Sequence, residues 1–242
     1  MCGRYTLKRE DFEALLRALR VKDPREFVTR YNIGPRTPVP AIRTAPDGGR
    51  DAVALEWGLL PRWSKDPRDA HRPANARAEG IAGRPAFREA FRHRRCVVPA
   101  SGFYEWQTIG KTKHPWYFQF REARPFLLAG IWESWTSADG VELQTCSLIT
   151  TEPNDLVRPL HDRMPVILRD AGIDVWLDRQ VREPAQLEPL LRPTPAELMT
   201  ATPVSPFVNS IRHEGPECIE PAVHPPEPPA PRPDEQLGLA LE

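Results

Sequence analysis

Cysteine is scarce in this chain, and its four cysteines lie far apart, at positions 2, 96, 146 and 218. No pair has the Cys-x-x-Cys spacing, which argues against a structural zinc site and against a dense disulfide framework. Cys96 and Cys146 lie in strand-like runs, where a cysteine is most often a small buried hydrophobe, and no role is assigned to them. We therefore expect no metal ion and a reducing, cytoplasmic setting.

Long apolar runs are also missing. No uninterrupted apolar stretch approaches the roughly 20 residues that span a bilayer. The charges at Arg4, Lys8 and Arg9 are not followed by an apolar signal segment. These absences predict a protein that is neither exported nor inserted into a membrane. With 242 residues, 40% of them hydrophobic, the chain is long enough for one large domain or two small ones.

Net charge is absent as well, because 33 basic residues balance 33 acidic ones. The acids gather at the C-terminal end, where residues 214–242 contain seven acidic residues and one arginine. The first 213 residues therefore hold 32 basic and 26 acidic side chains. A moderately positive body is compatible with a polyanionic partner without requiring one.

Residues 221–242 are rich in proline and acid and poor in large apolar side chains. A segment of this composition cannot bury enough surface to fold alone. We therefore expect a folded domain over residues 2–220, followed by a disordered tail. Either the tail is a neutral extension, or its acids compete with nucleic acid for a basic groove.

The hydrophobic pattern predicts one long helix near the start and strands beyond it. Phe12, Leu15, Leu16 and Leu19 repeat at helical spacing and predict a helix over residues 9–20. Short runs rich in β-branched and aromatic residues predict strands of one curved, antiparallel or mixed sheet, at residues 38–45, 51–60, 94–100, 102–107, 114–120, 124–135 and 143–151. Helices are predicted at residues 84–95, 184–191 and 194–199.

The amino terminus offers a distinctive reactive group. Removal of Met1 leaves Cys2 with a free α-amine beside its thiol. An aldehyde that meets this 1,2-aminothiol forms an imine with the amine, and the thiol then captures the imine as a five-membered ring. Unperturbed α-amines titrate near pH ~8 and thiols near ~8.5, so both nucleophiles are partly available at neutral pH. The alternative is an unremarkable cysteine in a disordered terminus.

Glu105 lies in the strand-like stretch GFYEW. Strand alternation places Phe103 and Glu105 on one face and Tyr104 and Trp106 on the other. Desolvation among aromatic groups is expected to raise the pKa of this carboxyl, as a general acid/base requires. Alternatively, Glu105 points to solvent from an edge strand.

Two further polar residues lie where chemistry is often placed. His161, in PLHDRMP, is predicted to lie in a loop at the start of a strand, where scaffolds commonly hold reactive histidines. A surface pairing with Asp162 is the alternative. Asn75, in NARAEG, follows a breaker-rich segment, where it either caps a turn or donates its amide to a ligand.

Basic and aromatic residues suggest a contact with nucleic acid. The densest basic stretch holds Arg84, Arg88, Arg92, Arg94 and Arg95 against one acid, Glu89. Such a run is either a solvated helix face or a phosphate-binding surface. Trp63, beside a proline turn, is either a core residue or a platform on which an unpaired base stacks.

Seven motifs occur in a fixed order, namely MCGR, YNIGP, WGLLPRW, NARAEG, RRCVVPASGFYEW, HDRMP and TPVSPFVNS. Over roughly residues 2–215 this series strongly resembles the family of SOS response-associated peptidases, or SRAP proteins. The resemblance implies a single α+β domain with a barrel-like, mainly antiparallel β core flanked by short helices. It also implies a groove for single-stranded DNA that ends at the cysteine.

The resemblance further implies a covalent reaction with abasic sites. The amine of mature Cys2 attacks the ring-opened aldehyde and the thiol closes a thiazolidine, so that a DNA–protein crosslink shields the lesion during replication. Glu105 is implied to shuttle protons, and His161 to stabilise or relay protons at the imine. Asn75 is implied to orient the cysteine or a sugar oxygen. Arg4 and Arg77, which match family positions, are expected to hold phosphates.

The expected DNA contacts extend to Trp63, Asn32, Pro35, Thr150 and Arg84. The reaction needs no cofactor and no metal. The expected partner is an abasic site in single-stranded DNA or at a junction of single and double strands. We expect a monomer in the cytoplasm that joins the nucleoid when bound to DNA.

Two other functions compete with this interpretation. One is a peptidase whose nucleophile is Cys2 and whose base is its own α-amine, acting in removal of Met1. The other is a noncatalytic binder of single-stranded DNA that uses the arginines and Trp63. That binder requires no abasic aldehyde and is sensitive to salt.

Overall fold

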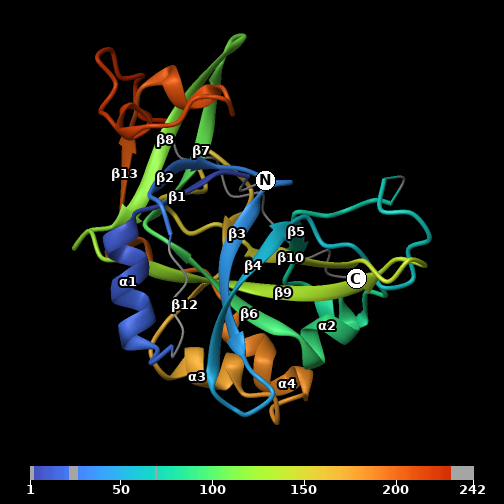
Figure 1. The fold of residues 1–242 in the computed structure, drawn as a ribbon. Helices are drawn as coiled ribbons and strands as arrows, with labels where there is room; N and C mark the ends of the chain where they lie inside the picture. Colours follow the sequence, from blue (N-terminus) through green and yellow to red (C-terminus); the bar gives the residue numbers. More distant parts are fainter. Residues whose placement is uncertain (1–2, 22–26, 69, 230–242) are drawn as a thin grey trace, which may run out of the picture.

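The structure is a computed structural model that describes residues 3–21, 27–68 and 70–229. Five of its strands close into a barrel at the centre of the molecule (Figure 1). They are β3 (Pro38–Thr44), β4 (Arg50–Trp57), β6 (Arg95–Ala100), β9 (Phe126–Thr136) and β10 (Glu142–Thr151). Their order is β10-β4-β3-β6-β9, and pairing of β9 with β10 closes the ring. Only β4 and β10 run parallel among these pairs.

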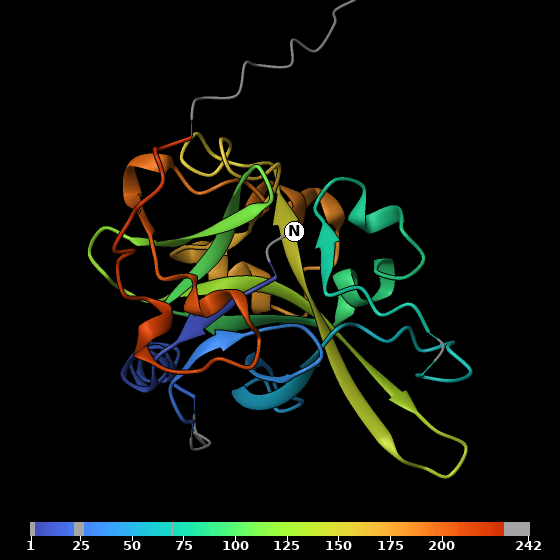
Figure 2. The same ribbon diagram turned by 90° about the horizontal axis from the view of Figure 1, so that it is seen from above.

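Three short strands pair with the ends of barrel strands. They are β5 (Asn75–Arg77), β11 (Met164–Pro165) and β12 (Ile167–Leu168). β5 runs parallel to β10 and continues the direction of β4, whereas β11 pairs with β10 and β12 with β9. Figure 2 shows β5 lying beside β10.

A second sheet stacks against the barrel in the order β13-β8-β7-β1-β2. Its strands are β1 (Tyr5–Leu7), β2 (Arg30–Ile33), β7 (Gly102–Ile109), β8 (Thr112–Phe120) and β13 (Met199–Pro203). All of its pairs are antiparallel. The chain leaves the barrel at Ala100 and enters this sheet at Gly102, where a Cβ atom would lie 2.3 Å from the Tyr117 ring. Glycine therefore permits the close approach of β7 to β8.

Short helices cover the outside of the barrel (Figure 1). They are α1 (Arg9–Ala18), α2 (Arg88–His93), α3 (Ala171–Leu177) and α4 (Pro184–Leu187). Single turns of 3-10 helix are η1 (Ile81–Gly83), η2 (Glu188–Leu190), η3 (Ala196–Leu198), η4 (Pro206–Asn209) and η5 (Pro216–Cys218). Because α1, α2 and α3 all contact β6, every residue of that strand is buried.

The predicted α+β class, with a barrel-like, mainly antiparallel core and short flanking helices, is confirmed. The predicted buried stripe of α1 is also confirmed, since Phe12 and Leu16 are buried. The prediction of a single curved sheet is wrong, because residues 102–109 and 112–120 belong to the second sheet. Hydrophobic patterns do not record which strands share a sheet.

Some predicted helices are shorter than expected, and several elements were missed. The helix predicted at residues 84–95 spans only Arg88–His93, and residues 194–199 form one 3-10 turn before β13. The strands β1, β2, β5, β12 and β13 were not predicted, nor was α3. Strands of two to five residues are too short for a periodicity to stand out.

The C-terminal described residues fold against the second sheet. Val204 forms an isolated bridge with Pro221, and the Ala222 N–H donates to the Pro203 carbonyl at 3.0 Å. The Gln107 amide donates to the Glu227 carbonyl at 3.2 Å. The start of the proline-rich segment thus contacts the sheet, whereas residues 230–242 lie outside the described residues. The predicted domain boundary at residue 220 and the disorder of the tail stay predictions.

Within the described part of the chain, no helix is long and apolar enough to cross a membrane.

Candidate active site

Glu105 is a carboxylate buried among aromatic side chains, with 2% of its surface exposed. It lies on β7, which is an interior strand of the second sheet. Trp116 of β8 is its direct partner, and the rings of Phe103 and Phe118 stack on the same face with centroids 5.0 Å apart. Tyr104 points to the other face, into a separate apolar cluster. The predicted alternation is therefore confirmed, and the alternative of a solvent-facing glutamate on an edge strand is excluded.

The first described residues run along β7 beside Glu105. Tyr5 pairs with Phe103 in antiparallel register, and the Tyr104 N–H donates to the Arg4 carbonyl at 3.0 Å. Continuing this register by two residues places Gly3 opposite Glu105. The described chain therefore begins next to the buried carboxylate. Cys2 itself lies outside the described residues.

Asn75 opens β5, at the edge of the barrel that faces β1. The Trp57 indole N–H donates to the carbonyl of Ala74 at 2.7 Å, which fixes the chain immediately before Asn75. The same indole contacts the Tyr5 ring in an edge arrangement, with centroids 5.7 Å apart. These contacts join the strand of Asn75 to the strand that follows the chain start.

His161 lies in the loop between β10 and β11, as predicted. Its backbone N–H donates to the Val157 carbonyl at 3.0 Å. Its Nδ1 accepts a hydrogen bond from the Arg163 backbone N–H at 3.0 Å and also lies 3.0 Å from a carboxylate oxygen of Asp162. A neutral ring protonated at Nε2 uses the first contact, whereas a ring that carries a proton on Nδ1 donates to Asp162 or to the Arg163 carbonyl, which lies 3.2 Å from Nδ1. Each protonation state of His161 therefore has a partner at Nδ1.

Arg163 ties the His161 loop to both β10 and the chain after β5. Its guanidinium forms a bidentate pair with Glu79, at 2.9 and 2.7 Å, and donates to the Thr150 carbonyl at 2.6 Å. The hydrogen bond from Arg163 lowers the pKa of Glu79, so that this pair stays charged at neutral pH. Arg163 was not assigned from the sequence, although it follows His161 within HDRMP.

A cavity of about 520 Å³ opens beside Asn75. Five residues predicted from the sequence line it, namely Trp63, Asn75, Arg77, Arg84 and Thr150. Trp63 is 61% exposed, and both arginines are exposed. Thr150 is buried and contributes part of the cavity wall. The cavity therefore combines positive charge with an aromatic surface, next to the strand that carries Asn75.

The apolar side of this cavity contains residues that the sequence analysis did not assign, namely Pro61, Pro73, Pro85, Ala86 and Phe87. His71 also lines it. The prolines come from segments that the sequence marks only as breaker-rich. Their convergence depends on the pairing of β5 with β10, which no local pattern specifies.

Arg4, Asn32 and Pro35 do not line this cavity. One nitrogen of the Arg4 guanidinium donates to the Asn32 amide oxygen at 2.6 Å and to the Val208 carbonyl at 3.1 Å. The Asn32 amide nitrogen donates to the carbonyls of Ser210 and His213, and the residue is 2% exposed. Burial lowers the pKa of Arg4 somewhat. Asn32 thus holds Arg4 in place.

Pro35 is half-buried in the turn that follows β2. The neighbouring Gly34 is buried and packs against Arg4, because a Cβ atom at Gly34 would lie 3.4 Å from the Arg4 side chain. The turn that carries Pro35 is therefore adjacent to Arg4 rather than to Asn75.

The basic run of residues 84–95 divides into exposed and structural arginines. Arg84, Arg88 and Arg92 are exposed, as expected of a solvated or nucleic-acid-binding surface. Arg94 instead forms an ion pair with the buried Glu133 at 2.7 Å. Arg95 is 6% exposed and donates to backbone carbonyls. Only the exposed arginines are accessible to a phosphate backbone.

The three described cysteines are buried, as predicted for Cys96 and Cys146. Burial raises the pKa of Cys96 to about 12 and that of Cys218 to about 11, and raises the pKa of Cys146 as well. At pH 8 a thiol with a pKa of about 11 is ionised in about one molecule in a thousand, whereas an ordinary thiol near ~8.5 is about a quarter ionised.

We therefore expect a short pulse of iodoacetamide at pH 8 to alkylate the folded protein at Cys2 alone. Peptide mass mapping checks this result, and protein unfolded in urea serves as the control in which all four cysteines react. Modification of Cys96, Cys146 or Cys218 in the folded protein at a rate like that of Cys2 contradicts the expectation.

Comparison with known proteins gives consistent matches along the chain. The family model described as SOS response associated peptidase (SRAP) matches residues 1–211. The abasic site processing protein YoqW of Bacillus subtilis is 38% identical over 225 residues, which cover 91% of this chain and 99% of that protein. The abasic site processing protein HMCES of Gallus gallus is 33% identical, covering 79% of this chain and 66% of that protein.

Among solved structures, a protein from Bacteroides thetaiotaomicron superposes with a TM-score of 0.82 at 28% sequence identity. The match covers 92% of this chain and all of that one. The barrel and the second sheet thus form a fold that recurs in proteins of low sequence identity.

Proposed function

Because this chain belongs to the SRAP family, we propose that it recognises abasic sites in single-stranded DNA and crosslinks to them through mature Cys2. The observation that supports the proposal is that Glu105 and the strand of Asn75 both lie close to the start of the described chain. Gly3 falls opposite the buried Glu105, and β1 is joined through Trp57 to the strand of Asn75. Cys2 immediately precedes Gly3 in the sequence.

In the proposed reaction the neutral amine of Cys2 attacks the aldehyde carbon of the ring-opened abasic sugar, and loss of water gives an imine. The Cys2 thiolate then adds to the imine carbon, and the nitrogen takes up a proton. The product is a five-membered thiazolidine. An aldehyde and an aminothiol become a thiazolidine and one water molecule, so no oxidant or reductant is consumed.

Three described residues have surroundings that suit these reaction steps. Glu105, in its apolar surroundings, exchanges protons with the sugar and with the amine. His161 has a partner at Nδ1 in each protonation state, which suits a proton relay at the imine. Asn75 lines the cavity, where its amide orients the sugar or the cysteine. Each role is a proposal that rests on these positions.

The strand of DNA is proposed to follow the cavity of about 520 Å³. Arg77 and Arg84 provide positive charge for phosphates, and Trp63 provides an exposed ring for a base. Arg4 lies outside this cavity, beside the chain start, and is held by Asn32. It is proposed to contact a phosphate next to the lesion.

The proposed function is tested by intact-mass spectrometry of the purified protein with a short abasic oligonucleotide. We expect loss of Met1 and a covalent adduct of protein plus DNA minus one water. We also expect the single-stranded oligonucleotide to react at least about tenfold faster than the same site in uninterrupted duplex, because extrusion from a duplex costs a few kcal/mol. Absence of an adduct overturns the crosslinking function, and equal rates contradict the strand preference.

We expect Trp63→Ala to weaken noncovalent binding of single-stranded DNA by about 5- to 100-fold, since stacking on an aromatic ring contributes roughly 1–3 kcal/mol per base. Fluorescence anisotropy with a labelled oligonucleotide measures the change. Val141→Ala is the matched control, because Val141 is 64% exposed and lies outside the cavity. If both variants bind like the parent protein, Trp63 is not a stacking platform.

A further inference from the structure

A second, smaller cavity of about 320 Å³ lies between β3, β9, α2 and α3. Its titratable lining is entirely basic, namely Arg43, His93, Arg94, Arg95 and Arg179. Burial and the charge of Arg182 lower the pKa of His93, so the positive charge at neutral pH comes from the four arginines. Within the described chain no carboxylate lines this cavity. We call it the basic cavity.

The positive charge of the basic cavity is only partly compensated. Arg94 has an ion pair with Glu133 at 2.7 Å, and Arg43 has one with Asp51 at 3.5 Å. Arg179 is exposed and forms no ion pair with any carboxylate in the described ranges. A net positive charge therefore remains around the cavity.

Arg95 adds a buried charge held by neutral groups. Its guanidinium donates to five backbone carbonyls, those of Phe91, Arg92, Trp176, Asp178 and Val181. Burial lowers the pKa of Arg95 to about 10, and the nearby Asp178 carboxylate offsets this in part. Arg95 thus stays protonated at neutral pH without a hydrogen-bonded carboxylate.

Arg43 is held in a fixed orientation at the cavity wall. Its guanidinium lies over the Trp132 ring, 4.3 Å from the centroid, and one nitrogen donates to the Gln144 amide oxygen at 3.2 Å. A guanidinium fixed by stacking is a planar, preorganised donor whose geometry matches phosphate oxygens. The cavity volume is at the low end of the range for small-molecule sites.

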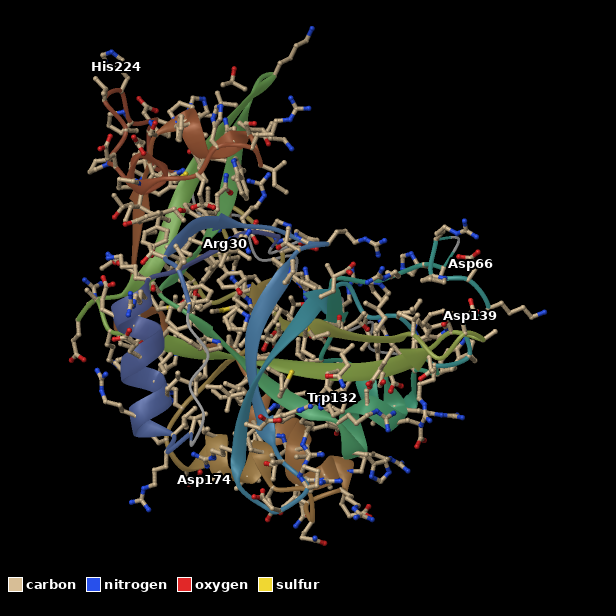
Figure 3. The ribbon with its side chains drawn as sticks, in the orientation of Figure 1. Arg30, Asp66, Trp132, Asp139, Asp174 and His224 are labelled. Carbon is tan, nitrogen blue, oxygen red and sulfur yellow. The ribbon has the colours of Figure 1, made fainter. Side chains whose placement is uncertain are left out.

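From this placement we propose that the basic cavity binds the phosphate group of a small ligand no larger than a nucleotide. The site is separate from the candidate active site. In Figures 1 and 3, Trp132, α2 and α3 lie in the lower half of the view, whereas β7 lies in the upper half. An adjoining cavity of about 470 Å³ shares Arg179 but is lined by two carboxylates, Asp174 and Asp178, as well as by further arginines, and it is not part of the proposed site.

The test is a titration of the full-length, ¹⁵N-labelled protein followed by NMR at constant ionic strength. The probes are inorganic phosphate, deoxyadenosine monophosphate and, as the uncharged control, deoxyadenosine. We expect the Trp132 indole and His93 ring signals to shift saturably with both phosphate compounds and not with deoxyadenosine. For phosphate itself the dissociation constant should lie in roughly the millimolar range. Binding of the nucleotide at least about tenfold tighter than phosphate identifies a nucleotide site, and equal affinities identify a site for phosphate alone.

Two variants separate a specific site from general positive charge. Arg179→Gln is expected to weaken phosphate binding about 5- to 10-fold, because it removes a charge-assisted donor. Arg17→Gln removes the same charge from an exposed arginine of α1 that lines neither this cavity nor the one beside Asn75, and it should leave binding unchanged. Crosslinking to abasic DNA should proceed at the parent rate in both variants. The absence of a saturable shift, or equal weakening by the two variants, overturns the proposal.

Discussion

Replacing Cys2 by alanine is expected to abolish the stable crosslink to abasic single-stranded DNA, with less than about 1% of the parent adduct remaining. The thiazolidine needs the sulfur, and without it the imine formed by the α-amine hydrolyses back to the aldehyde. Noncovalent affinity should stay within about twofold, because the proposed phosphate and base contacts come from Arg4, Arg77 and Trp63. A denaturing gel measures the crosslink, and anisotropy measures the binding.

Chemical trapping separates the two nucleophilic groups of Cys2. With borohydride present, Cys2→Ala should yield a reduced secondary amine between its α-amine and the sugar. In the parent protein the adduct should form without borohydride. A protein that retains Met1 has no free α-amine at Cys2 and should form no thiazolidine. Intact mass reports Met1 and the adduct together.

Cys218→Ala is the matched control for loss of a thiol. Cys218 is buried within the cluster of Tyr104, Tyr117, Val204 and Val208. Its substitution should lower the melting temperature slightly and leave the crosslink yield unchanged. A crosslink that survives in Cys2→Ala without borohydride, or one that disappears in Cys218→Ala, is incompatible with the proposed chemistry.

Patterns along the chain predicted the seven longest strands but not how they assemble. The run that became β6 is buried at every residue, and those of β9 and β10 are buried over most of their length, so apolar residues make up most of β6 and β9. The runs of β3 and β4 are only partly buried and mix apolar with polar residues. Closure of the barrel depends on the pairing of β9 with β10 and of β4 with β10, and these contacts leave no local signal. The break between the two sheets occurs within Ser101 and Gly102, where the packing of Tyr117 requires glycine.

In the candidate site, too, the sequence predicted individual residues but not the contacts that hold them in place. Part of the neighbourhood of Glu105 followed from strand alternation, which places Phe103 on the same face. The support that Arg163 gives the His161 loop, and the support that Asn32 gives Arg4, did not follow. Both are hydrogen bonds between side chains and partners that are distant in sequence. Their positions depend on the fold and not on residue type.

Substitution Glu105→Gln is expected to slow crosslink formation by at least about 100-fold, the lower end of the effect of a general acid/base. Glutamine keeps the size of the side chain and removes its ability to exchange a proton. Because 2% of Glu105 is exposed among Phe103, Trp116 and Phe118, bulk water cannot readily replace it. Single-turnover kinetics with saturating protein, followed on denaturing gels between pH 5 and 9, measure the effect.

Glu133→Gln is the control that distinguishes an effect on the reaction from the loss of stability caused by altering a buried carboxylate. Glu133 is 3% exposed, and its ion pair with Arg94 lies away from β7. Burial raises the pKa of Glu133 in spite of this partner. Removing its charge leaves Arg94 without its carboxylate, so the melting temperature should fall while the crosslinking rate of folded protein stays at the parent value. If Glu105→Gln instead lowers stability without slowing the reaction, Glu105 is a structural residue, and the proton transfers must pass through His161 or water.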